Sequence, residues 1–183
     1  MRMLSVGDFH IAGREIKVAV LWDERGVLGV TYSLEGDEFL RERVITLGSF
    51  LSRRGVAFNT SVAASRFPET VFDAIRGRLP NVNVLPMLSF DGLTPFERKV
   101  YEVLTKTVKR GEVITYGELA RRLNTSPRAV GGAMMRNPYS IVVPCHRVVA
   151  SNGIGNYTPK VSYKEFLLEI EGVKRWTNSK FTS

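Results

Sequence analysis

The sequence has few of the side chains from which metal sites and disulfide bonds are built. It contains one cysteine, Cys145, and two histidines, His10 and His146, in 183 residues. A single cysteine excludes an internal disulfide bond, and these three side chains are too few for a structural zinc site. We therefore expect no metal or other cofactor, and a fold that packing alone holds together.

Long hydrophobic runs are also absent from the sequence. No stretch approaches the ~18 consecutive apolar residues that a membrane helix needs, and the opening MRMLSVGDFH lacks the apolar core of a signal peptide. Hydrophobic residues make up 44% of the chain, which is enough for one large core or two small ones. These features predict a cytoplasmic protein with no membrane partner.

Acidic residues are scarce in the second half of the chain. Residues 1–93 carry 11 Lys and Arg against 11 Asp and Glu, whereas residues 94–183 carry 15 against 7 and hold the whole net charge of +8. A solvated basic surface would have the same composition. The asymmetry nevertheless favours contact with a polyanion, and nucleic acid is a better candidate than an acidic membrane.

The first half of the chain has the pattern of a small α+β domain. Its apolar periodicity and turn residues predict a hairpin of strands at 15–22 and 26–33, helices over 37–55 and 67–79, and a short strand within 56–63. The stretch 79–92 is rich in Pro, Asn and Gly and is a candidate linker. We place the boundary so that residues 1–86 form the N-terminal α+β domain and 87–183 the C-terminal domain.

The second half carries three helix starts with strong local signals. Thr94 and Thr115 are each followed three residues later by a glutamate, the pattern of a capping box, and Ser126 precedes Pro127 at the third start. The short turn NTS joins the last two helices. This pattern predicts a mainly helical C-terminal domain that contains a helix-turn-helix, and the whole chain is of the mixed α/β (α+β) class.

Two adjacent glycines, Gly131 and Gly132, lie in the middle of the third predicted helix. Each costs about 1 kcal/mol relative to alanine, so a reason for their presence is required. Close packing between helices is one explanation. A bare helical face that lets a DNA backbone approach is the other, and Arg128 in the first turn would suit phosphates there.

The only cysteine lies in the apolar run IVVPCHRVV, between Pro144 and His146. A lone cysteine in such a run is commonly a small buried hydrophobe. A thiolate is a good nucleophile when positive charge lies nearby, and His146 and Arg147 follow directly. Consecutive side chains in an extended segment point to opposite faces, so a bridging water between Cys145 and His146 is plausible. The residues by themselves leave an inert and a reactive thiol equally open.

The motif PCHRVV is preceded by GEVITYGELA, RAVGGAM and RNP and followed by GNY and LLEIEG. In this order and spacing, residues 94–173 closely resemble the O6-alkylguanine-DNA alkyltransferase family, also called methylated-DNA–protein-cysteine methyltransferases. The first half fits the variable α+β domain of that family in outline. The resemblance implies DNA repair by a single irreversible transfer of an alkyl group from O6 of guanine, and more weakly from O4 of thymine, to Cys145.

The resemblance also implies roles for residues around the cysteine. His146 would take the thiol proton through a water, Glu171 would orient that histidine, and Tyr116 would donate a proton toward N3 of the departing guanine. The other implied residues are Asn137 under the site, Arg128 as a finger that fills the gap left by the flipped nucleotide, Ser151 on phosphate, and a substrate pocket of Met134, Val148, Tyr157 and Thr158.

The implied partner is double-stranded DNA that contains O6-alkylguanine, entered from the minor groove by a protein that we expect to be a monomer. Thr158 departs from the family, where serine is frequent. Three alternatives stay open: a non-catalytic protein that flags alkylated bases, a cysteine hydrolase that uses Cys145 and His146, and a helix-turn-helix regulator that reads a defined sequence in the major groove.

Overall fold

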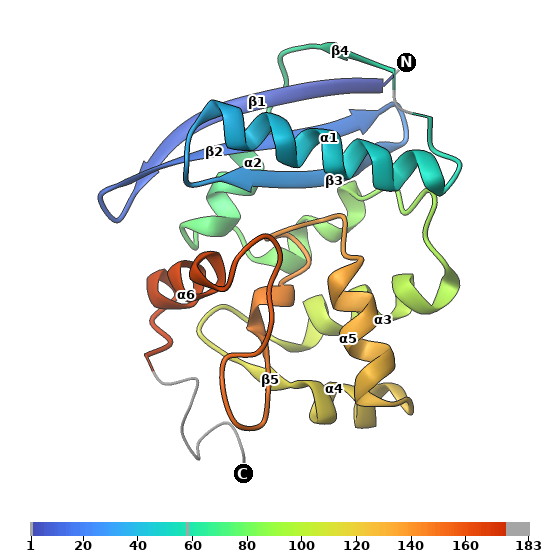
Figure 1. The fold of residues 1–183 in the computed structure, drawn as a ribbon, viewed down its shortest axis with the longest axis vertical. Helices are drawn as coiled ribbons and strands as arrows, with labels where there is room; N and C mark the ends of the chain where they lie inside the picture. Colours follow the sequence, from blue (N-terminus) through green and yellow to red (C-terminus); the bar gives the residue numbers. More distant parts are fainter. Residues whose placement is uncertain (1, 58, 175–183) are drawn as a thin grey trace.

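The computed structural model describes residues 2–57 and 59–174 (Figure 1). Its N-terminal domain is built on four strands: β1 (Arg2–Ile11), β2 (Arg14–Asp23), β3 (Gly26–Ser33) and β4 (Thr60–Val62). Their order in the sheet is β3-β2-β1-β4; the first three form an antiparallel meander, and β4 runs parallel to β1. The predicted hairpin is confirmed. The sequence analysis did not predict β1, and the strand expected within 56–63 is only three residues long.

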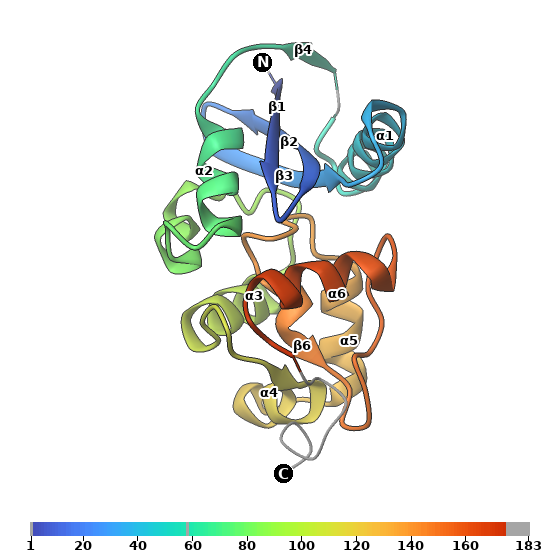
Figure 2. The same cartoon turned by 90° about the vertical axis from the view of Figure 1, so that its left-hand side faces the viewer.

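Two helices cover the two faces of this sheet. Helix α1 (Asp37–Arg53) packs against β2 and β3, and α2 (Phe67–Ile75) packs against β1 and β2 on the opposite face (Figure 2). Gly55 follows α1 with a φ of 81°, as expected for a helix stop. Helix α2 ends earlier than its apolar pattern predicts because Gly77 adopts a φ of 78°, which no continuing helix allows.

The C-terminal domain is mainly helical, as predicted. Its elements are α3 (Pro95–Thr107), β5 (Ile114–Thr115), α4 (Tyr116–Leu123), α5 (Pro127–Met135), the 3₁₀ turn η3 (Cys145–Arg147), β6 (Val148–Val149) and α6 (Val161–Ile170). The predicted caps are present, because the hydroxyls of Thr94, Thr115 and Ser126 each accept a hydrogen bond of 3.1 Å from the backbone three residues on. Asn124 in the left-handed conformation turns the chain between α4 and α5.

The two domains are hydrogen-bonded to each other through the edge of the sheet. The carbonyl of Val30 on β3 accepts a hydrogen bond from Ser140 N at 3.3 Å, and the N–H of Val30 donates to Pro138 O at 2.8 Å. The candidate linker 79–92 is not a free connection: it forms two 3₁₀ turns, η1 (Asn81–Asn83) and η2 (Leu85–Met87), and buries Asn81 and Leu85. The segment that leads to Cys145 is therefore hydrogen-bonded to the edge strand of the N-terminal sheet.

The core runs through both domains without a break among the described residues. Val30 and Tyr32 of β3 belong to the same buried cluster as Tyr139 and Val143 on the way to the cysteine. No helix in residues 2–57 and 59–174 combines the length and the hydropathy that crossing a membrane requires.

Candidate active site

Cys145 opens the 3₁₀ turn η3 rather than lying in an extended strand. Its N–H donates to Val143 O at 2.7 Å, and Arg147 N donates to Pro144 O at 2.9 Å, so the chain turns tightly at the thiol. The sequence analysis expected an extended segment here, in which consecutive side chains would point to opposite faces; the 3₁₀ turn differs from that expectation. Cys145 keeps partial exposure, while the next two side chains, His146 and Arg147, are only 1% exposed.

His146 and Arg147 converge on one carboxylate, that of Glu171 at the C-terminal end of α6. Nε2 of His146 lies 2.9 Å from Oε2 of Glu171. Nε and Nη2 of Arg147 donate to Oε1 and Oε2 at 2.8 and 3.0 Å. Arg147 also donates to Val108 O and to Oδ1 of Asn81. A buried carboxylate is thus held by two cationic or hydrogen-bonding partners, an arrangement that keeps it ionised.

The charge states of this trio follow from its contacts. Burial alone would raise the pKa of Glu171, but His146 and Arg147 outweigh it and hold that pKa well below its usual range. Burial lowers the pKa of His146, although Glu171 opposes the shift. The neutral ring then donates Nε2–H to the carboxylate, which leaves the lone pair on Nδ1. Nδ1 is buried and has no hydrogen-bond partner among the described residues, so it is free to act as a base.

The thiol itself is held mostly in its protonated form. Burial raises the pKa of Cys145, and the side chain of Asn137 and the charge of Lys164 oppose that rise. The charge that acts on the sulfur therefore comes from Lys164 on α6, whereas the adjacent Arg147 is committed to Glu171. Such a thiol needs a base to become a nucleophile.

Asn137 holds the turn beneath the cysteine, just past α5. Its Nδ2 donates to Val143 O at 3.0 Å, and its Oδ1 accepts from Tyr139 N at 2.9 Å. Both contacts fix the backbone between the helix-turn-helix and Cys145, so the amide couples these two parts of the domain.

Lys164 is a second buried cation of the site. It is fully buried, and its Nζ donates to Val148 O at 2.6 Å and to Asn156 O at 3.1 Å. Its Nζ also lies 5.9 Å from the centre of the Tyr116 ring. Burial lowers the pKa of Lys164 to about 8, and no carboxylate among the described residues forms an ion pair with it. Lys164 thus links the cysteine, the tyrosine and the strand β6.

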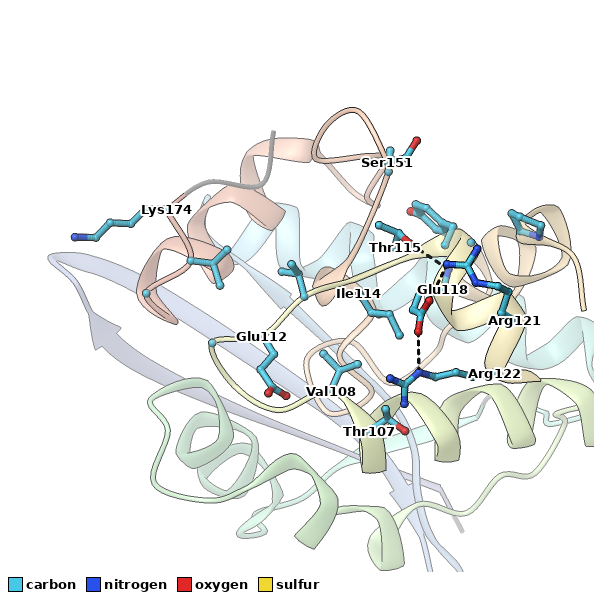
Figure 3. Close-up of a pocket in the computed structure, with 18 residues that line it drawn as sticks. Thr107, Val108, Glu112, Ile114, Thr115, Glu118, Arg121, Arg122, Ser151 and Lys174 are labelled. Atoms are coloured by element: carbon cyan, nitrogen blue, oxygen red, sulfur yellow. Dashed lines mark hydrogen bonds and ion pairs between the residues drawn. The ribbon is translucent and has the colours of Figure 1, made fainter. Parts of the chain in front are cut away.

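Tyr116, the first residue of α4, lines a groove on the surface of the C-terminal domain. Figure 3 shows this groove with its neighbours Thr115 and Glu118 labelled. The groove has a volume of about 1150 Å³, and Thr115, Tyr116 and Ser151 are among the residues that line it. Burial and the neighbouring Cys145 raise the pKa of Tyr116, so its hydroxyl stays protonated and able to donate. Cys145 does not line the groove.

Basic side chains flank this groove. Figure 3 shows Lys174 on one side and Arg121 and Arg122 on the other. The two arginines contact Glu118 at 2.7 and 3.5 Å, which offsets part of their charge. Ser151 lies exposed in the loop after β6 and is one of the residues that line the groove.

The outer face of α5 is open. Arg128 is exposed in its first turn and has no ion pair among the described residues. A Cβ atom added at Gly131 would meet nothing within 4 Å, and one added at Gly132 would meet only the guanidinium of Arg136, a residue just past the end of the same helix, at 2.9 Å. Close packing between helices therefore does not explain the glycines. The bare face that remains is available to a partner.

The four residues expected to form a substrate pocket differ in their surroundings. Val148 is fully buried in β6 and Met134 is 9% exposed on α5, so neither side chain faces much open space. Thr158 is exposed. Tyr157 is half-buried, and its hydroxyl lies 2.9 Å from that of Tyr32 on the N-terminal sheet.

Sequence reasoning did not single out Lys164, Asn81 or Tyr32. A signal for Lys164 exists, because it shares one helical face with Leu167 and Leu168, and a lysine on an apolar helical face indicates a buried cation. Asn81 and Tyr32 carry no comparable local signal. Within the described residues, no three His, Cys, Asp or Glu side chains are grouped so that they could hold a metal ion.

Comparison with known proteins agrees with this geometry over nearly the whole chain. A family model described as the N-terminal domain of methylated DNA-protein cysteine methyltransferase matches residues 3–91. A second, described as the DNA-binding domain of 6-O-methylguanine DNA methyltransferase, matches residues 95–173. A methylated-DNA–protein-cysteine methyltransferase of Thermococcus barophilus is 58% identical over 176 residues, which cover 96% of this chain and 100% of that protein.

Solved structures show the same fold. The crystal structure of the O6-methylguanine-DNA methyltransferase of the hyperthermophilic archaeon Pyrococcus kodakaraensis aligns with a TM-score of 0.90 at 53% identity, covering 93% of this chain and 100% of that one. A Mycobacterium tuberculosis OGT, crystallised in complex with DNA, shares the fold with a TM-score of 0.66 at 24% identity, with 93% of each chain covered. This protein therefore belongs to the methylated-DNA–protein-cysteine methyltransferase family.

Proposed function

We propose that this protein repairs DNA by moving the alkyl group of O6-alkylguanine, and more weakly of O4-alkylthymine, to the sulfur of Cys145, once per molecule. The reaction of the family is the transfer of a methyl group from O6-methylguanine in DNA to a cysteine of the protein itself. The observation that carries the assignment is that Cys145 is the only cysteine in the sequence and lies beside a buried His–Glu pair.

The first step is removal of the thiol proton. Nδ1 of His146 is the free basic nitrogen, and a water between it and the sulfur would carry the proton. Glu171 stabilises the imidazolium that forms, and Arg147 keeps that carboxylate ionised and in place. The charge of Lys164 favours the thiolate. Together these groups produce the nucleophile only when the site is assembled.

The second step is displacement at the alkyl carbon. The thiolate of Cys145 forms a bond to that carbon, and the bond from the carbon to O6 breaks, so that its electron pair stays on the guanine. Tyr116 donates its hydroxyl proton to N3, which neutralises the leaving base. The tyrosinate then regains a proton from the imidazolium of His146 by way of water, so that both side chains end neutral. The product is a thioether, which does not react further, and no cofactor takes part.

DNA binding is assigned to the helix-turn-helix, and the protein binds DNA as its family does. The base must leave the stack to reach the sulfur of Cys145, at a cost of a few kcal/mol. The exposed Arg128 would fill the gap from the minor groove, the bare face at Gly131 and Gly132 would admit the backbone, and Ser151 would contact a phosphate.

Met134, Val148, Tyr157 and Thr158 would surround the flipped base, with the carbonyls of Cys145 and Val148 facing its amino group. Val148 O already accepts from Lys164, and its second lone pair would serve the base. We keep a monomer acting on double-stranded DNA in the cytoplasm as part of this proposal.

The decisive test is mass spectrometry of the protein after incubation with a duplex that contains O6-methylguanine. We expect one methyl group on the peptide that contains Cys145, in an amount equal to the lesions lost, and none in Cys145→Ala, which should still bind the duplex. Unmodified Cys145 beside intact lesions would refute the proposal. Repeated turnover on an ester or amide would instead support a cysteine hydrolase.

A further inference from the structure

The N-terminal domain takes no part in the chemistry proposed above, yet it contacts Tyr157, one of the residues proposed to surround the flipped base. Tyr32 is 1% exposed on β3, the edge strand that faces the C-terminal domain. Its hydroxyl lies 2.9 Å from the hydroxyl of Tyr157, which comes from the loop between β6 and α6. The contact joins residues 125 positions apart in the sequence.

This hydroxyl pair is persistent. Burial raises the pKa of Tyr32 and that of Tyr157 well above their usual value, so both hydroxyls stay protonated. One donates and the other accepts at any pH at which the protein would be assayed. The position of the Tyr157 ring is therefore tied to the N-terminal sheet.

Other contacts secure the same loop to the same corner of the sheet. Lys160 forms an ion pair with Glu35 at 2.8 Å. Tyr163, in the first turn of α6, accepts a hydrogen bond from Leu34 N at 3.0 Å, and its ring lies 5.4 Å from that of Tyr32. The chain that follows Tyr157 is thus held by Leu34 and Glu35, which come directly after β3.

We propose that Tyr32 is a positioning residue for alkyl transfer: through the hydroxyl of Tyr157, the N-terminal domain sets the shape of the pocket that receives the alkylated base. This inference rests on the proposed function, because it takes Tyr157 as a wall of that pocket. A side chain fixed before the substrate arrives costs less to order on binding, and a misplaced wall slows a reaction that depends on alignment.

The test uses Tyr32→Phe, which removes the hydroxyl and keeps the ring. We expect the rate at which free O6-benzylguanine alkylates Cys145 to fall about fivefold, the size expected for one hydrogen bond. The rate with an O6-methylguanine duplex should fall less, because DNA contacts position that base independently. Affinity for undamaged duplex should not change.

A double-mutant cycle separates positioning from general stability. Tyr157→Phe should slow the free-base reaction as Tyr32→Phe does, and the double variant should be no slower than either single one. Ser5→Ala is the matched control, because Ser5 is a buried hydroxyl on the same sheet that contacts Ala63 O and Trp22, away from the pocket. It should lower the unfolding temperature and leave the rate unchanged.

Each outcome bears on the inference. Additive losses, an unchanged rate in Tyr32→Phe, or an equal loss in Ser5→Ala would overturn it while the proposed function stands. A wild-type protein that is never alkylated at Cys145 would instead overturn the proposed function. Rates are measured well below the unfolding temperature of every variant, so that loss of folded protein does not enter the comparison.

Discussion

The carboxylate of Glu171 lies 2.9 Å from Nε2 of His146, and this contact decides which nitrogen of the histidine can act as a base. Because Nε2–H is directed to Glu171, the lone pair of the neutral ring is on Nδ1. Arg147 binds the same carboxylate on both oxygens and keeps it ionised. Base, orienting acid and fixed cation therefore form one unit.

Substitution of Glu171 should disable this unit. In Glu171→Gln, the amide no longer stabilises an imidazolium, and we expect the rate of Cys145 alkylation to fall about 10²-fold. The change also leaves the buried Arg147 without its counter-ion, which should cost about 3–5 kcal/mol of unfolding free energy. The measurements are single-turnover alkylation and denaturant unfolding.

The control for that experiment is Glu169→Gln, an exposed carboxylate two residues earlier on α6. It should match the wild type in both measurements. Alkylation by Glu171→Gln at the wild-type rate, with the protein folded, would contradict the role of the carboxylate in orienting His146.

A second carboxylate makes the stability depend on acid pH. Glu97 on α3 is 2% exposed and contacts Arg54 and Arg136, each at 2.7 Å. The hydrogen bond from Arg54 is the main cause that lowers the pKa of Glu97 from its ordinary value of 4.5 to about 2. The ionised form is thus favoured by folding, so its stabilisation is complete above pH 4.5 and is lost as the pH falls toward 2.

Glu97→Gln should therefore remove part of the acid sensitivity. Between pH ~5 and pH ~2, the wild type should lose about 2 kcal/mol more unfolding free energy than the variant does. Denaturant unfolding across that range measures the difference. Glu102→Gln, one turn later on α3 and paired with Arg98, is the control and should follow the wild type. Equal slopes for wild type and Glu97→Gln would be inconsistent with the low pKa.

Gly131 should separate stability from DNA binding. Gly131→Ala adds a Cβ that meets no atom of the protein within 4 Å, so the gain in helix propensity should raise the unfolding free energy by about 0.5–1 kcal/mol. If a DNA backbone approaches this face, affinity for a duplex should fall in the same variant. Thermal unfolding and fluorescence anisotropy on one preparation test both effects. Unchanged affinity would remove the reason proposed for the bare face.

Arg128 should contribute to DNA binding and to extrusion of the lesion, without preference for the bases around it. Arg128→Ala should weaken duplex binding, lower the slope of log affinity against log salt by about 1, and reduce extrusion of the lesion. A 2-aminopurine reporter beside the lesion measures extrusion. Arg66→Ala, exposed in the N-terminal domain, should change neither. Relaxation of a strong sequence preference would favour a helix-turn-helix regulator instead.

Local signals in the sequence predicted most of the helices and the hairpin of β2 and β3. The caps at Thr94, Thr115 and Ser126 are satisfied by the residues next to them, which is why the sequence indicates them correctly. Strand β1 was missed, because its side chains mix polar and apolar residues on a half-exposed surface. Strand β1 is stabilised by pairing with β2, and the sequence of β1 alone does not indicate that pairing.

The site divides in the same way. The sequence alone determined that one thiol exists, that a histidine follows it and that positive charge gathers in the second half, since these are properties of composition and order. Only the tertiary structure decided the contacts of the site. Arg147 binds Glu171, the charge of Lys164 acts on the sulfur of Cys145, and the hydroxyl of Tyr32 contacts that of Tyr157. The physical reason is that burial and contact depend on residues far apart in the chain. A local sequence pattern contains no information about the distance between such residues in the folded protein.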